Sequence, residues 1–171
     1  VKPLVDAAER GDRRQRDAVF AALRQISGPE VGPAIVESVS AAPMGVRTAV
    51  IRVVQDRQLV EAVPTLQMQA LQSDTEVARA SLRALAVLAN PSDLPDLLGI
   101  LVKQPPGLRK QAELTVTAVA QKIVPPEERA TPLVAFLDLQ ADASVRDSLL
   151  RSLAGTGCEK ALEVLAREAE G

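Results

Sequence analysis

The sequence predicts an all-α protein: a right-handed α-solenoid of about five two-helix repeats that ends in a C-terminal half repeat. Three observations point to this fold class. The apolar composition almost lacks aromatic residues, prolines recur at a fixed spacing, and a second series of residues recurs with the same spacing.

The composition favours closely packed helices. Hydrophobic residues make up 47% of the 171 residues, yet Phe20 and Phe136 are the only aromatic ones. Leu, Ala and Val supply the rest of the apolar content. A β-sandwich or barrel normally depends on aromatic and β-branched side chains, so this composition argues against one.

The repeat shows in the prolines and in a marker position 13 residues after each proline. Pro33, Pro64 and Pro95 are 31 residues apart, and Pro132 follows after 37. The markers keep these spacings: Val46, Val77, Leu108 and Val145. Counting back 31 residues from Val46 reaches Gln15, in a weaker first copy. Recurrence at a fixed period of this length is typical of solenoid repeats.

Two further columns of residues are apolar in every copy. The first column lies two residues after the prolines and consists of Ile35, Leu66, Leu97 and Val134. Leu165 continues it in the last copy. Eight residues after each marker stand Leu23, Val54, Leu85, Val116 and Leu153. Together with the marker, the second column gives the spacing of one helix face.

These columns divide the chain into helix pairs. We expect units at about 1–28, 29–58, 59–90, 91–124 and 125–156 and a half unit at 157–171, all in one array over 1–171. The first helix of each unit, helix A, opens near its proline, and the second, helix B, opens near its marker. Turn residues separate the helices at 42–45, 73–75, 104–107 and 141–144, and the units at 27–29 and 90–93.

The fourth spacing is six residues longer than the others, and the excess falls around residues 124–128. We expect it to lengthen the flanking helices and to bend the stack locally. A helix pair of this size cannot bury its apolar stripe alone, so each pair is expected to stack on its neighbours.

Two stretches resemble HEAT repeats, in particular the short HEAT-like class of the phycobilisome lyases. They are VPTLQMQALQSDTEVARASLRALAVLA and LVAFLDLQADASVRDSLLRSLAGTG. The resemblance covers about residues 3–169, although Pro3 lies one residue out of register and Gln15 replaces the apolar marker, so the first unit is interpreted as an N-terminal cap. It implies a solenoid whose B helices line the concave side, but it does not imply lyase activity.

One arginine follows the marker in four units: Arg16, Arg47, Arg109 and Arg146. We interpret this column as a structural ladder, in which each guanidinium pairs with turn aspartates or helix-end carbonyls of adjacent units. Asp12, Asp74 and Asp142 stand at suitable turn positions. A row of anion contacts is the alternative.

A second set of basic residues lies two, six or nine positions after the markers, on the helix-B face away from the apolar columns. This stripe, the candidate partner-binding surface, consists of Arg24, Arg52, Arg79, Arg83, Lys110 and Arg151. Asp17 and Asp147 share the face, which leaves a mild positive excess. Such a stripe is either a solvated surface or a site for acidic partners.

Little in the sequence supports an enzyme. The chain has no His, no cluster of metal ligands and no Gly-rich phosphate loop, and we expect no cofactor and no small-molecule substrate. Cys158, after Gly155-Thr156-Gly157, is expected near the start of the last helix, where it is interpreted as a small apolar residue at a helix junction.

The sequence therefore predicts a non-catalytic scaffold that binds a protein partner on its helix-B face. One alternative is a binder of polyanions or nucleic-acid backbones, which is disfavoured because Trp and Tyr are absent and the net charge is -2. Another is a structural module of a larger enzyme or secreted protein. No apolar run is long enough for a membrane span. A single cysteine slightly favours the cytoplasm without excluding the periplasm or secretion. The chain begins at Val1 without Met, so either a leader was removed or the chain is an excerpt of a longer one, and the unpaired last helix favours the excerpt.

Overall fold

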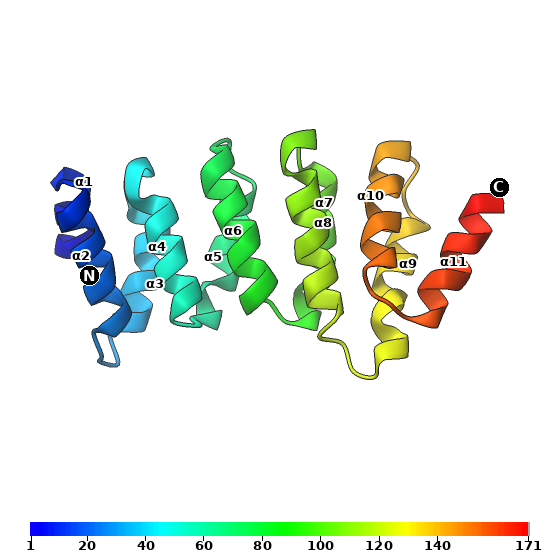
Figure 1. Ribbon diagram of the computed structural model, residues 1–171, viewed down its shortest axis with the longest axis horizontal. Coiled ribbons are helices and arrows are strands. Elements are labelled where there is room, and N and C mark those ends of the chain that lie inside the picture. Colours follow the sequence, from blue (N-terminus) through cyan, green and yellow to red (C-terminus); the bar gives the residue numbers. More distant parts are fainter. Residues whose placement is uncertain (171) are drawn as a thin grey trace. The chain divides into compact units, whose positions relative to one another are not determined.

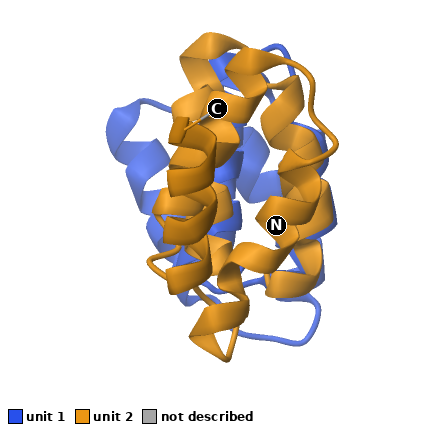
Figure 2. Ribbon diagram, turned by 90° about the vertical axis from the view of Figure 1, so that its right-hand side faces the viewer, with its two compact units in different colours: residues 1–88 blue, residues 89–171 orange. Residues whose placement is uncertain are grey.

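The computed structural model describes residues 1–170, and over these residues it is all-helical, with eleven α-helices, three short 3-10 helices and no strand (Figure 1). The chain divides into two compact units, residues 1–88 and 89–171 (Figure 2). Each unit is built from helices that pack against their neighbours along the chain.

The first unit contains three helix pairs. They are α1 (Lys2–Arg10) with α2 (Arg13–Gln25), α3 (Val31–Ala41) with α4 (Met44–Asp56), and α5 (Val63–Ala70) with α6 (Thr75–Leu88). The 3-10 helix η1 (Val60–Ala62) leads into α5. Within this unit α2, α4 and α6 form one layer and α1, α3 and α5 form the other (Figure 1).

The second unit contains two helix pairs and one further helix. The pairs are α7 (Leu94–Lys103) with α8 (Pro106–Ala120), and α9 (Thr131–Leu137) with α10 (Ala143–Ala154); α11 (Glu159–Glu170) packs against α10. The 3-10 helices η2 (Pro91–Asp93) and η3 (Pro126–Ala130) precede α7 and α9. Helix α8 lies beside α10, and α7 beside α9.

The apolar columns form the core of both units. The markers Val46, Val77, Leu108 and Val145 are buried, and so are eight of the ten column residues. Val134 and Leu165 are half-buried. Ser81 interrupts the apolar face of α6, but its buried hydroxyl has a hydrogen-bond partner, because it donates to the Val77 carbonyl, 2.8 Å away.

Prolines open most of the first helices of the pairs, as the sequence predicts. Pro64, Pro95 and Pro132 are each the second residue of their helix, and Pro33 is the third residue of α3. In the first turn the missing N–H of proline would have no helical partner anyway.

The expectation for the six-residue excess fails for one of the two flanking helices. Helix α8, with 15 residues, is the longest α-helix described, whereas α9, with 7 residues, is the shortest, and the excess before it forms a loop and η3. Pro125 and Pro126 explain the difference, because a proline lacks the N–H that a continuing helix needs and disfavours helical geometry at the residue before it.

Candidate interaction groove

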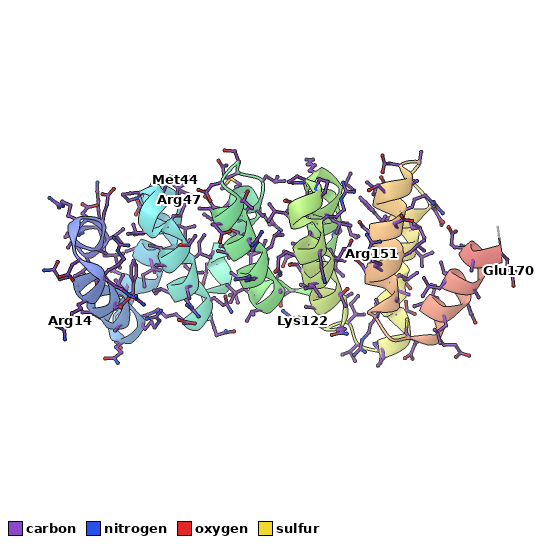
Figure 3. The ribbon with its side chains drawn as sticks, turned by 45° about the horizontal axis from the view of Figure 1, so that its top comes forward. Arg14, Met44, Arg47, Lys122, Arg151 and Glu170 are labelled. Carbon is purple, nitrogen blue, oxygen red and sulfur yellow. The ribbon has the colours of Figure 1, made fainter. Side chains whose placement is uncertain are left out.

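The arginines that follow the markers bind the ends of the preceding helices. Arg47 donates from Nε and Nη2 to the Ala42 carbonyl, at 3.1 and 2.7 Å, and from Nη2 to the Ser40 carbonyl at 3.1 Å. Both carbonyls lie at the end of α3, where the last C=O groups of a helix lack intrahelical partners. Arg47 therefore joins the end of α3 to the start of α4 (Figure 3).

The same arrangement recurs in three other pairs. Arg16 donates to the Ala8 carbonyl at 3.2 Å, and Arg109 to the Gln104 carbonyl at 3.2 Å. Arg146 donates to the carbonyls of Leu137 and Gln140 at 3.1 and 3.2 Å. Further bonds reach the next pair along the chain, where Arg47 donates to Gln69 and Arg109 to Ser144. Arg146 donates in the same way to Glu168 on α11.

The turn aspartates have a different role from the expected pairing with these arginines. Asp12 accepts a hydrogen bond from the Gln15 N–H, Asp74 from Val77 and Asp142 from Val145, each at 2.9 Å. Each carboxylate thus caps a second helix of a pair, where the first N–H groups lack helical partners. Gln15 completes a capping box with Asp12, which gives this residue a local structural role in place of an apolar marker.

A groove of about 960 Å³ lies on the layer formed by α2, α4 and α6. Its lining consists of Asp17, Phe20, Arg24, Thr48, Ala49, Ile51, Arg52, Gln55, Asp56, Glu76, Arg79, Ala80 and Arg83. We call this surface the α2–α4–α6 groove. It brings together four members of the predicted basic stripe, and the other two, Lys110 and Arg151, lie on helices of the second unit.

Charges in the α2–α4–α6 groove are partly paired. Arg24 Nε lies 2.6 Å from Asp56 Oδ2, which links α2 to α4. Arg79 lies 3.6 Å from Glu76, one helical turn away on α6. Arg52 and Arg83 are exposed, and neither has an ion pair with any residue that the structure describes. The cations available to a ligand are therefore mainly these two.

The stripe residues of the second unit differ in their surroundings. Arg151 on α10 binds the carboxylate of Glu113 on α8 through Nε, 3.2 Å from each oxygen, and Nη2, 2.8 Å from Oε1 (Figure 3). The hydrogen bonds to Glu113 raise the pKa of the Arg151 guanidinium further, against an opposing effect of desolvation. Lys110 is exposed. Arg151 thus already has an internal partner.

Sequence reasoning missed the three carboxylates that neutralise stripe arginines: Asp56, Glu76 and Glu113. Glu76 could have been found, because it lies three residues before Arg79 on one helix, a spacing that places side chains side by side. Asp56 and Glu113 are 32 and 38 residues from their partners, and the apolar repeat says nothing about such pairs.

Other candidate chemistry is sparse. Cys158 is buried just before α11 and lies 3.5 Å from the Thr156 hydroxyl. Burial raises the pKa of its thiol, but hydrogen bonds from Thr156 and nearby backbone groups outweigh this effect and lower the pKa overall. In residues 1–170 no three His, Cys, Asp or Glu side chains are placed to share a metal ion. None of the helices in this part of the chain has the length and apolar character needed to cross a bilayer.

No protein-family model, curated protein or solved structure matches the chain. Its function must therefore be inferred from the chemistry of its own surfaces. The α2–α4–α6 groove combines an open hollow, two guanidinium groups without ion pairs in the described part of the chain, and three carboxylates. A partner with charged groups can pair with such a surface.

Proposed function

We propose that the chain is a non-catalytic protein–protein interaction module that binds its partner in the α2–α4–α6 groove. The observation that carries the proposal is the clustering of four stripe arginines around one open hollow of about 960 Å³. Grooves between packed helices commonly accept a segment of another protein. Arginine is enriched among the residues that dominate such interfaces.

Within this proposal the chain is a short HEAT-like array, a right-handed α-solenoid of about five repeats and a C-terminal half repeat. The support is the repeated pattern itself. In four of the pairs the second helix carries a buried marker followed by stripe residues, all of which are exposed except the half-buried Arg79. An arginine also follows the marker position in four of the pairs. In a solenoid the second helices would form a continuous surface, of which the α2–α4–α6 groove would be one part.

Photo-crosslinking combined with a steric block tests the function. A benzophenone amino acid replaces Gln55 in the groove. In the control it replaces Gln72, an exposed residue outside the groove. The crosslinked adducts that form in extracts of the source cells are then identified. The affinity of the purified adduct partner is then measured for wild type, Thr48→Tyr and a control, Gln72→Tyr. Thr48 lines the groove, so its enlargement should obstruct a bound segment.

We expect protein adducts from position 55 and not from position 72, and a loss of affinity on the order of tenfold or more for Thr48→Tyr alone. Adducts with nucleic acid would favour the polyanion alternative. Equal adduct formation at both positions, or equal affinity of both tyrosine variants, would contradict the proposal.

A further inference from the structure

The α2–α4–α6 groove carries an unbalanced set of charges at one place. Arg24 and Arg79 have carboxylate partners, whereas Arg52 and Arg83 have none within the described part of the chain. These two residues occupy equivalent positions, each six residues after a buried marker, on the neighbouring helices α4 and α6. The groove therefore presents two free guanidinium groups at the same level of adjacent helices.

Small side chains leave room between these arginines. Thr48, Ala49 and Ala80 line the groove and are half-buried, while the larger apolar residues Phe20 and Ile51 are almost fully buried beneath it. A bound backbone can come close to such a surface while its longer side chains reach the arginines at the sides. The exposed surface of the groove is thus more polar than apolar, and it carries several charged groups.

Resting on the proposed function, we infer that the α2–α4–α6 groove binds an acidic segment of the partner protein, with Arg52 and Arg83 each receiving a carboxylate. Packed helices lie about 8–10 Å apart, and an extended chain advances about 3.3 Å per residue with alternate side chains on the same face. Carboxylates two residues apart therefore share a face about 7 Å apart, and the long arginine side chains can close the remaining gap. Guanidinium groups bind carboxylates through paired, charge-assisted hydrogen bonds.

The groove's own carboxylates favour a short acidic segment over a nucleic acid. Asp17, Asp56 and Glu76 lie in the same lining, and each would repel a phosphate placed close to it. A nucleic-acid backbone carries a charge at every nucleotide and cannot avoid all three positions. A peptide can place its few carboxylates at Arg52 and Arg83 and neutral side chains elsewhere.

A random-peptide display library selected on the wild-type chain tests this inference without a known partner. Recovered peptides are labelled, and their affinity is measured by fluorescence anisotropy at about 150 mM salt. The variants are Arg52→Gln/Arg83→Gln and the matched pair Arg13→Gln/Arg14→Gln, which removes two exposed charges of the same unit outside the groove. Asp17→Asn, Thr48→Tyr and a labelled DNA duplex complete the set.

We expect peptides rich in Asp and Glu whose affinity falls on the order of tenfold in Arg52→Gln/Arg83→Gln and less than about twofold in Arg13→Gln/Arg14→Gln. Asp17→Asn should tighten binding, because it removes a like charge. Circular dichroism confirms that each variant keeps its helices.

The two proposals fail differently. Neutral or basic peptides that Thr48→Tyr blocks and Arg52→Gln/Arg83→Gln leaves unchanged would overturn the acidic segment and keep the groove as a protein-binding site. If no peptides are recovered, if Thr48→Tyr leaves their binding unchanged, or if the duplex binds more tightly than any peptide, both proposals fall.

Discussion

The guanidinium of Arg151 on α10 forms an ion pair with the carboxylate of Glu113 on α8, with Nη2 2.8 Å from Oε1. The two ends differ in exposure: the Glu113 side chain is 11% exposed and the Arg151 side chain 59%. The free energy of the pair therefore depends mostly on what happens to the carboxylate when its partner is removed.

Replacing Arg151 by Ala should lower the free energy of unfolding by about 1–3 kcal/mol, because it leaves a mostly buried carboxylate without its partner. Glu113→Gln should cost less, since the amide oxygen still accepts a hydrogen bond. Urea denaturation measures both variants, with Lys110→Ala as an exposed control on α8. If Arg151→Ala is no more destabilising than Lys110→Ala, the pair contributes nothing to stability.

Arg47 and Arg52 lie on the same helix, but the same substitution should destabilise the chain only at Arg47. Arg47→Gln should cost about 1–3 kcal/mol of unfolding free energy, because the Ala42 carbonyl loses both of its charged donors. Arg52→Gln should stay within about 0.5 kcal/mol of wild type, as surface changes usually do. Thermal and urea unfolding measure the free energy of unfolding of both variants. A larger loss in Arg52→Gln than in Arg47→Gln would refute the structural role of Arg47.

Gly155 leaves no room for a side chain. A Cβ there would lie 2.5 Å from Thr117 Cγ2 on α8, so Gly155→Ala should destabilise the chain by about 1–3 kcal/mol. Gly107→Ala is the control, because a Cβ at Gly107 meets nothing within 4 Å. Thr117→Ala should remove most of the effect of Gly155→Ala, and additive losses in the double variant would contradict a direct clash.

Asp142 should stabilise α10 through its cap. Asp142→Ala removes the acceptor for the Val145 N–H and should cost about 1 kcal/mol. Asp138→Ala removes an equal charge from an exposed position just after α9 and should have little effect. Denaturation midpoints at neutral pH compare the two, and equal losses would show that charge rather than capping is responsible.

Much of the fold could be predicted because it follows from local rules. A buried marker such as Val77 and a column residue such as Leu85 lie on one face of the same helix, so their spacing reveals both the helix and its buried side. The opening prolines likewise act within one turn. The loop at Pro125 and Pro126 was the exception, although their own chemistry argues against a continuing helix.

The groove was predictable only in outline. The stripe positions identify Arg52 and Arg83 as exposed on neighbouring second helices, because every pair repeats the same register. The partners of Arg24 and Arg151 were not predictable, because Asp56 and Glu113 reach them from other helices, and the side-chain pairing across helices has no period in the sequence. Local charge counts therefore overestimate how many cations are free for a partner.

A hydrogen bond to the end of the preceding helix is made by each of Arg16, Arg47, Arg109 and Arg146, and these bonds have a consequence for how such a chain can change in evolution. Their principal acceptors are main-chain carbonyls at the end of the preceding helix, and every residue type has such a carbonyl. Mutation of the acceptor residues therefore leaves these bonds available. Each of these four helix pairs contains its own linking hydrogen bonds, so these pairs could be duplicated, deleted or exchanged without a matching charge having to arise elsewhere.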